Sequence, residues 1–259
     1  MMRFVQGVGR YTLLTCETIG ICFTHPPQWT LIREQMYEFG FCSLPVILVT
    51  GFSIGMVLSA QAFFQLSDKG LTGTTGIMVA KSMLVEIGPL LTAFMMTGRI
   101  GAAICAELGS MRVTEQIDAL SSMAVNPIRY LVAPRFIAML FMMPCLTAFS
   151  CTTGIYGGYL VAVDLYGMSP TDFLSPIPDY LTWYDVFSGL LKSTIFGLLI
   201  VTISCFYGMN TTGGAVGVGR STTRSVVMCY TCILITNFLL TVFLNAFFWV
   251  FFGGYKIFT

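Results

Sequence analysis

The sequence predicts an all-α integral membrane protein of about five transmembrane helices, with an interfacial helix at its N-terminus and a charged helix between two spans. Of the 259 residues, 56% are hydrophobic and only 10% are charged, and the mean hydropathy is +0.81. The apolar residues fall in continuous runs, and about 20 such residues suffice to cross the hydrocarbon core of a bilayer. Because these runs lack the strict alternation of a membrane β-barrel, helices are favoured.

The first 38 residues form an amphipathic segment ahead of the membrane domain, which we place at 39–259. Arg3, Arg10 and Glu17 recur every seven residues and therefore share one helical face, which indicates an interfacial helix. The same charges interrupt the apolar core that a cleaved signal peptide needs, so none is expected. His25-Pro26-Pro27 is expected to end this helix, and a second short amphipathic stretch follows at 29–38.

Five apolar stretches account for most of the remaining chain. We place them at 39–65, 76–97, 136–163, 186–207 and 226–252. No internal repeat, low-complexity tract or long linker divides them, so we expect a single membrane unit. An odd number of spans puts the two termini on opposite sides of the membrane.

Basic residues predict the orientation, because short cytoplasmic loops retain Lys and Arg. They gather before the first span and in the segments between spans two and three and between spans four and five, at Arg3, Arg10, Arg33, Arg99, Arg112, Arg129, Arg135, Arg220 and Arg224. The N-terminus is therefore expected to be cytoplasmic and the C-terminus to lie outside. Topology explains these basic residues, and with a net charge of +1 nucleic-acid binding is not expected.

The first span carries small residues at every fourth position, Gly51, Gly55 and Ser59. These residues form one stripe along which another helix can approach closely. The pattern alone does not distinguish packing within the chain from contact with a second chain, and both interpretations stay open.

Three charged residues lie inside the predicted spans, Lys81, Glu86 and Lys192. Each costs roughly 2.5 to 3.5 kcal/mol to insert, so they are expected to face protein or a wet cavity. Lys81 and Glu86 are five residues apart, which places them poorly for a pair within one helix, and Lys192 is the alternative partner for Glu86. A structural ion pair and a direct role in handling a polar headgroup are both compatible with this pattern.

Catalytic and metal-binding patterns are weak. The chain has one His and lacks the G-x-S-x-G and H-E-x-x-H motifs, so we expect neither a catalytic residue nor a metal site. Gly214 to Ser221 comes within one residue of a P-loop, but Arg220 replaces its Lys and a membrane span precedes it, which excludes a nucleotide site. Arg220 and Arg224 remain candidates for contact between this cytoplasmic loop and a partner. Cys229 and Cys232 are interpreted as small buried residues.

The charged segment at 98–135 is the main candidate for docking. Charged residues of alternating sign and apolar residues are interleaved in it, at Glu107, Met111, Arg112, Glu115, Asp118 and Leu120. This pattern predicts a short amphipathic helix that ends before Asn126-Pro127. From the pattern alone, such a helix is equally suited to a groove on another protein and to the membrane surface.

Ordered blocks of residues occur along nearly the whole chain. They are Gly51-Phe-Ser-Ile-Gly55 with Leu58 and Gln61, Glu86-Ile-Gly-Pro89, Gly98-Arg99-Ile-Gly101, Ala106-Glu107-Leu-Gly109, Met111-Arg112, Thr114 to Leu120, Asn126-Pro127, Pro134-Arg135, Gly157-Gly158, Lys192, Gly213 to Gly219 and Thr222-Thr223. In this order and spacing the blocks resemble the MlaE, or YrbE, permeases of ABC transporters that move lipids together with MCE-domain proteins. Two departures are Ala124, where many members have Gly, and Thr97, where Ala is usual.

The resemblance implies a homodimeric permease in a bacterial inner membrane that moves phospholipid to or from an MCE-domain ring. Two ATPase subunits would bind ATP-Mg, so this chain itself needs no cofactor. The helix at 107–123 would be the coupling helix that enters a groove of the ATPase. The candidate lipid cavity between the subunits takes residues from three spans, Gly51, Gly55, Ser59, Gln61, Glu86 and Lys192.

Two other functions remain possible from the sequence. In an autonomous secondary transporter or channel, Lys81, Glu86 and Lys192 would couple ion movement, and transport would not need ATP. In a non-transporting membrane scaffold, assembly would be independent of lipid and substitutions in the cavity would be tolerated.

Overall fold

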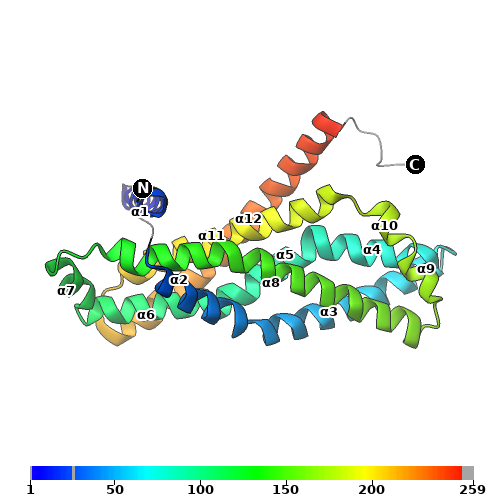
Figure 1. Ribbon diagram of the computed structural model, residues 1–259, viewed down its shortest axis with the longest axis horizontal. Coiled ribbons are helices and arrows are strands. Elements are labelled where there is room, and N and C mark those ends of the chain that lie inside the picture. The colour runs from blue at the N-terminus through cyan, green and yellow to red at the C-terminus, as the bar shows by residue number, and fades with distance from the viewer. Residues whose placement is uncertain (1, 25–26, 253–259) are drawn as a thin grey trace.

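A computed structural model describes residues 2–24 and 27–252, and this part of the chain is helical (Figure 1). Five helical stretches are long and apolar enough to cross a membrane, at Trp29–Ser67, Thr72–Val113, Ile128–Leu165, Trp183–Met209 and Gly214–Val250. The predicted fold class and the five spans are therefore confirmed. Residues His25 and Pro26, where a helix break was expected, and residues 253–259 lie outside the described part.

The spans are divided into shorter helices and single turns. In chain order the elements are α1 (Met2–Thr24), α2 (Trp29–Met36), η1 (Tyr37–Phe41), α3 (Leu44–Ser67), η2 (Thr72–Thr74), α4 (Thr75–Ser82), η3 (Met83–Ile87), α5 (Gly88–Met96), η4 (Thr97–Gly101), α6 (Ala102–Val113), α7 (Gln116–Ser122), η5 (Ile128–Val132), α8 (Ala133–Leu160), η6 (Val161–Leu165), α9 (Pro170–Leu174), α10 (Ile177–Tyr180), α11 (Trp183–Met209) and α12 (Gly214–Phe252).

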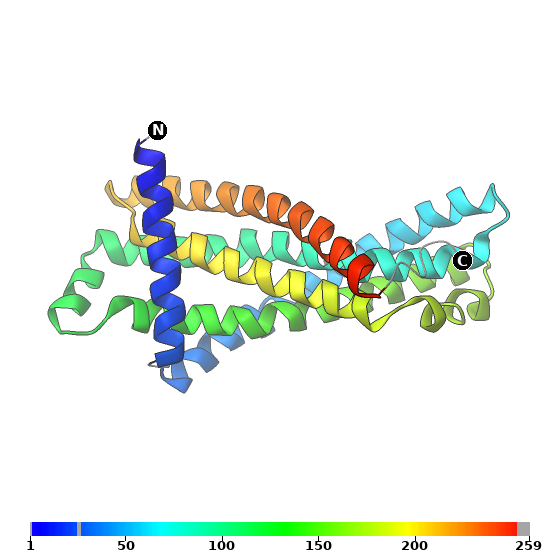
Figure 2. The ribbon, with the colours of Figure 1, turned by 90° about the horizontal axis from the view of Figure 1, so that it is seen from above.

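The long helices run roughly side by side, and α1 crosses them at one end of the bundle (Figure 2). The hydroxyl groups of Tyr11 in α1 and Thr202 in α11 lie 2.8 Å apart, which fixes α1 to the bundle. The short helix α7 lies at the same end, whereas α9 and α10 lie at the opposite end (Figure 1). The second half of α12 leaves the other helices and points away from them (Figure 1).

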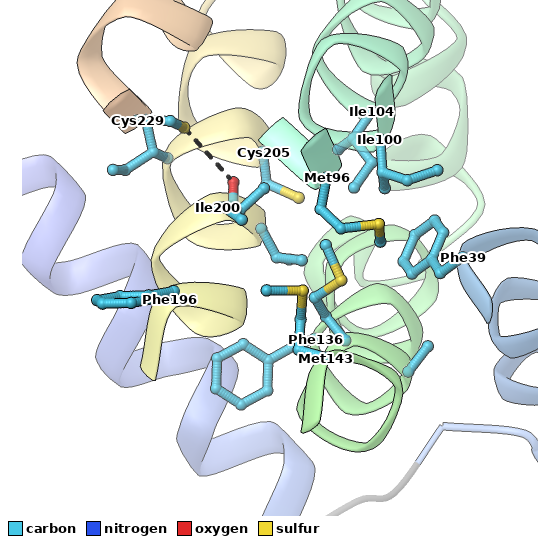
Figure 3. Packing of buried hydrophobic residues seen from close by; sticks show 14 of the residues in the cluster. Phe39, Met96, Ile100, Ile104, Phe136, Met143, Phe196, Ile200, Cys205 and Cys229 are labelled. Atoms are coloured by element: carbon cyan, nitrogen blue, oxygen red, sulfur yellow. Dashed lines mark hydrogen bonds between the residues drawn. The ribbon is translucent and has the colours of Figure 1, made fainter. Parts of the chain in front are cut away.

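Buried apolar side chains from α5, α8 and α11 meet in the middle of the bundle. Met96, Met143 and Phe196 are among the fully buried members of this cluster (Figure 3). Cys229 is also buried there, and its sulfur lies 4.0 Å from the carbonyl oxygen of Ile200. Its burial agrees with the interpretation of the C-x-x-C as packing residues, because buried cysteines behave as small apolar side chains.

Five π-helical turns interrupt the helices of the described chain, at η1, η3, η4, η5 and η6. A π turn holds one more residue than an α turn, so it changes the face that the following residues present and often marks a functional position. Two of these turns, η3 and η4, lie within the second span and divide it into α4, α5 and α6. Glu86 lies in η3.

The small-residue stripe of α3 packs against α8. A methyl group on Gly51 would lie 2.7 Å from the carbonyl oxygen of Ser150, and one on Gly55 would overlap the backbone of Gly154. The Ser59 hydroxyl donates to the carbonyl oxygen of Gly158 over 2.8 Å. A second stripe on α8, at Ser150, Gly154 and Gly158, faces the first, and the two backbones approach closely because neither stripe carries a large side chain.

Candidate functional site

A polar cluster joins three spans inside the apolar bundle. Its centre is an ion pair in which Lys192 Nζ of α11 donates to Glu86 Oε1 of η3 over 2.5 Å. The structure thus selects Lys192 as the partner of Glu86. Lys81 is exposed on α4 and forms no ion pair within the described residues.

The π turn and the proline after it help to hold Lys192 in place. In an α-helix the carbonyl oxygen of Val85 would accept the amide hydrogen of residue 89, but Pro89 has none. Lys192 Nζ lies 3.2 Å from this oxygen and donates to it. A buried ammonium group thereby finds a second acceptor, and a carbonyl group inside the membrane domain finds a donor.

Helix α12 closes the cluster with two polar residues one turn apart. Asn237 Nδ2 donates to Glu86 Oε2 over 3.1 Å, and the Thr241 hydroxyl donates to Glu86 Oε1 over 2.8 Å. Lys192 Nζ in turn donates to the Thr241 oxygen over 2.9 Å. Both carboxylate oxygens therefore have partners, which offsets part of the cost of removing the charges from water.

The two charges differ in their access to the surroundings. The Lys192 side chain is 1% exposed, whereas the Glu86 side chain is 36% exposed. Beside them, Asn237 Oδ1 is buried and has no partner in the described part of the chain. The cluster thus presents a partly exposed carboxylate, which suits a polar group of a ligand, and holds behind it a buried amide oxygen whose hydrogen-bonding capacity is unused.

The sequence analysis missed Asn237 and Thr241, since the fifth span was read only for its overall hydropathy. A local signal was present. Asn237, Thr241 and Asn245 recur every fourth residue in an otherwise apolar stretch and therefore mark one polar face. Polar residues inside a span usually face other helices or a cavity.

The four α3 residues assigned to the lipid cavity do not join this cluster. Gly51, Gly55 and Ser59 are buried against α8, so the expectation that they line a cavity is corrected to one of packing within the subunit. The physical reason is the facing stripe of small residues on α8, which leaves no space between the helices. Gln61 is exposed on α3.

The candidate docking segment is two helices and not the single helix that we expected. Helix α6 ends at Val113, and Glu115 adopts a left-handed conformation with φ of 60° before α7 begins. Across this turn, Arg112 Nη1 donates to Asp118 Oδ1 over 2.5 Å, and both side chains are exposed. The turn therefore folds α7 back toward α6 and places an ion pair between them.

Other residues of this segment contact neighbouring helices. Arg135 of α8, which is 8% exposed, donates to Glu107 Oε2 over 3.0 Å and to the carbonyl oxygen of Leu131 over 2.7 Å. Met111 and Leu120 pack against the apolar cluster and are only partly buried. Glu107 is thus tied to α8 although its side chain is 49% exposed, so Glu107, Arg112, Glu115 and Asp118 all present charge at this end of the bundle.

Arg220 and Arg224 are exposed one turn apart near the start of α12. The segment Gly214 to Ser221 is helical, so its backbone does not form the loop that cradles phosphate in a P-loop. The structure does not test the expected contact of these two residues with a partner, and it stays a prediction.

The Permease MlaE family model matches residues 32–243, which cover three of the five spans in full, most of the first and fifth, and the polar cluster. The chain belongs to the MlaE permease family. The family model begins after α1, so the helix that crosses the bundle lies outside the matched region. Glu86, Lys192 and Asn237 all lie within it.

Three relatives of this MlaE family chain come from distant sources. A probable ABC transporter permease of Rickettsia typhi is 40% identical over 93% of both chains. The intermembrane phospholipid transport system permease protein MlaE of Haemophilus influenzae is 39% identical, over 82% of this chain and 81% of its own. The chloroplastic protein TRIGALACTOSYLDIACYLGLYCEROL 1 of Arabidopsis thaliana is 37% identical, over 83% of this chain and 61% of its own.

Proposed function

We propose that this MlaE family chain is the transmembrane permease subunit of an ABC transporter that moves phospholipid. The observation that carries the proposal is the similarity, over four-fifths of each chain, to a Haemophilus influenzae permease named for intermembrane phospholipid transport. Five apolar spans around a polar cluster suit this function, because a phospholipid has apolar chains and a charged headgroup. A separate ATPase subunit would hydrolyse ATP, and this chain would be non-catalytic.

The polar cluster would contact the lipid headgroup. The partly exposed Glu86 carboxylate is the acceptor that a headgroup can reach, and the buried Asn237 amide and Lys192 lie behind it and hold it in place. Acceptors of this kind suit the ammonium or hydroxyl donors of a headgroup. Phosphate would be a poor match, because Glu86 repels it and Lys192 is already occupied.

The end of the bundle that carries α6 and α7 would dock on the ATPase. In this proposal the N-terminus and α7 are cytoplasmic, the membrane is a bacterial inner membrane, and an MCE-domain ring lies outside. Two copies of the chain would form a homodimer with two ATPase subunits. Tighter binding of ATP to the closed ATPase would bias the paired permeases toward one arrangement of their cavity.

The test is to co-express the chain with its candidate ATPase and MCE partners and to purify the assembly through a tag on this chain. Stable co-purification, ATP hydrolysis, bound phospholipid and ATP-dependent lipid transfer between vesicles would support the proposal. Transfer without ATP would instead indicate an autonomous transporter. Assembly without bound lipid or transfer would indicate a scaffold.

The same assay tests the headgroup contact. Asn237→Leu should lower the transfer rate while leaving the assembly intact, because it removes the amide that holds the Glu86 carboxylate in place. Asn245→Leu, an exposed position two turns further along α12, is the matched control and should transfer at the normal rate. Equal rates for both variants and the unmodified protein would contradict the assignment of the cluster to the headgroup.

A further inference from the structure

An apolar cavity lies between α1, α11 and α12. None of the described residues that line it belongs to the polar cluster. The cavity has a volume of about 450 Å³, within the range of about 300–1,000 Å³ that is typical of ligand pockets. Leu199 and Ile203 of α11 and Met228 and Ile235 of α12 line it, and Tyr11 of α1 forms another wall. A space of this composition suits an acyl chain.

A basic pocket of about 260 Å³ adjoins this apolar cavity. Arg220 and Arg224 line the basic pocket together with Asn210, and Phe206 and Tyr207 line both spaces. The two spaces therefore share a wall of two aromatic side chains, with guanidinium groups on one side of it and only apolar and weakly polar groups on the other. This is the order of groups along a phospholipid.

The two spaces lie along one face of α12, and we call them together the groove. On α12 the lining residues fall three or four apart, at Gly217, Ser221, Arg224, Met228, Cys232 and Ile235. Residues at this spacing share one face of a helix. Arg224 and Ile235 are eleven residues apart, which corresponds to about 16 Å along the helix axis at 1.5 Å per residue. The groove thus runs along α12 from its charged start into its apolar part.

The charge in the groove is not neutralised within the described chain. The three ion pairs found there involve other residues, and neither Arg220 nor Arg224 has an acidic partner among the described residues. Two cations beside an apolar cavity complement an anion that carries a hydrocarbon chain. Basic pockets between transmembrane helices bind anionic headgroups in this way, and a guanidinium group matches phosphate geometry with two parallel hydrogen bonds.

The geometry points to a binding site for an anionic phospholipid, with its phosphate at Arg220 and Arg224 and one acyl chain in the cavity between α1, α11 and α12. This site goes beyond the proposed function, because it lies apart from Glu86 and Lys192 and requires neither ATP nor transport. Tyr11 bonds to Thr202 and packs edge to face on Phe206, with ring centroids 5.8 Å apart, so a bound lipid would join α1 to the bundle.

The first test titrates phosphatidylglycerol into the full-length chain in mild detergent and counts retained lipids by native mass spectrometry. Diacylglycerol and inorganic phosphate are titrated in parallel, since each carries only one half of the chemistry. We expect retention of phosphatidylglycerol alone. In R220Q/R224Q the apparent affinity should fall by about tenfold or more, because the charge-assisted bonds to phosphate are lost.

The matched control for charge is R33Q/R129Q, which removes two exposed arginines elsewhere and should leave the affinity unchanged. The matched pair for the cavity is Gly7→Leu and Gly9→Leu. At both glycines of α1 an added Cβ atom would have no neighbour within 4 Å, so both variants should fold, but only Gly7 lines the cavity. Gly7→Leu should therefore weaken retention, and Gly9→Leu should not.

Four results would overturn the assignment. These are unchanged affinity in R220Q/R224Q, an equal loss in R33Q/R129Q, equal retention of diacylglycerol, and binding of inorganic phosphate that phosphatidylglycerol does not displace. In a separate co-purification with the ATPase, loss of that subunit from R220Q/R224Q that keeps its lipid would show that the two arginines form a protein contact and that the site is wrong. The lipid titrations use neither ATP nor transfer, so they test the site independently of the proposed permease function.

Discussion

The pairing of Glu86 with Lys192 shows how far single residues can be interpreted from sequence. The cost of a charge in a membrane predicted that these residues would face protein, and helix geometry disfavoured Lys81 as the partner. What sequence did not show was the turn that aims them. The π turn at 83–87 and the approach of Lys192 to the Val85 carbonyl depend on the packing of three helices, which no local pattern encodes, whereas the missing amide hydrogen of Pro89 can be read from the sequence.

Removal of one charge should destabilise the protein more than removal of both. We expect Lys192→Met to lower the free energy of unfolding by about 2 kcal/mol, less than the 3–5 kcal/mol typical of a fully buried pair because Glu86 is partly exposed. The double variant Glu86→Gln/Lys192→Met should recover part of this loss. Thermal unfolding in detergent measures both, and Lys81→Met, at an exposed position, should change stability by at most about 0.5 kcal/mol.

The departure from the family pattern at Ala124 can be explained only from its backbone conformation. Ala124 has φ of 58°, in the left-handed region that disfavours residues with a side chain by roughly 1–2 kcal/mol. Glycine has no side chain and adopts this conformation without that cost. This is a physical reason for the glycine that the family resemblance led us to expect at position 124. The sequence showed the departure but not the conformation, because it predicted only that the helix ends before Asn126-Pro127 and not which residue turns into the left-handed region.

At the scale of elements, the contact between α3 and α8 was half predictable. The stripe of Gly51, Gly55 and Ser59 predicted close approach by another helix, and the structure shows that approach. The partner was not predictable, because short stripes occur in several spans and the match to Ser150, Gly154 and Gly158 is a relation between distant segments.

A methyl group in this contact should be costly. We expect Gly55→Ala to reduce stability by about 2 kcal/mol, since the added group would overlap the backbone of Gly154, which cannot rotate away. Gly20→Ala on α1 is the control, because nothing lies within 4 Å and alanine favours a helix by roughly 0.5–1 kcal/mol. Thermal unfolding of the two variants distinguishes them, and similar midpoints would argue against tight packing at Gly55.

The turn between α6 and α7 separates a local role of Arg112 from a docking role. Its ion pair with Asp118 is exposed, and such pairs contribute roughly 0–1 kcal/mol, so Arg112→Glu should leave the fold intact. The same reversal should weaken co-purification of the ATPase. The swap Arg112→Asp/Asp118→Arg retains an ion pair across the turn. If docking depends on the charges themselves, the swap should also fail, whereas recovery of the ATPase would show that only the shape of the turn matters.

At the scale of the whole molecule, the predicted number of spans is confirmed. The hydropathy of the sequence marked the apolar centres, and several of the helices continue beyond these centres, as in the second span at Thr72–Val113. Helix α1 crosses the bundle, as an interfacial helix would (Figure 2). Its position at a membrane surface stays a prediction, as does the cytoplasmic N-terminus.

The outward face of α12 is a candidate for the contact between two copies of the chain. Phe238, Leu239, Val242 and Phe243 are exposed there, and the last part of the helix leaves the bundle. If this face is the dimer contact, Phe238→Ala should weaken dimerisation about tenfold, as expected for a central aromatic residue. Phe141→Ala, which truncates an exposed Phe on α8, should not. Mass photometry over a dilution series measures both, and unchanged dimers in Phe238→Ala would place the contact elsewhere.

The residues of the polar cluster are synthesised at different times, so the cluster forms in stages. Glu86 leaves the ribosome 106 residues before Lys192 and 151 residues before Asn237. At about 5–20 residues per second, the carboxylate spends roughly 5 to 20 s in or near the bilayer before its counter-charge is made. During that interval water or the membrane-insertion machinery must solvate the Glu86 carboxylate. The ion pair can therefore form only after the fourth span is made, and the hydrogen bonds from Asn237 and Thr241 only after the fifth.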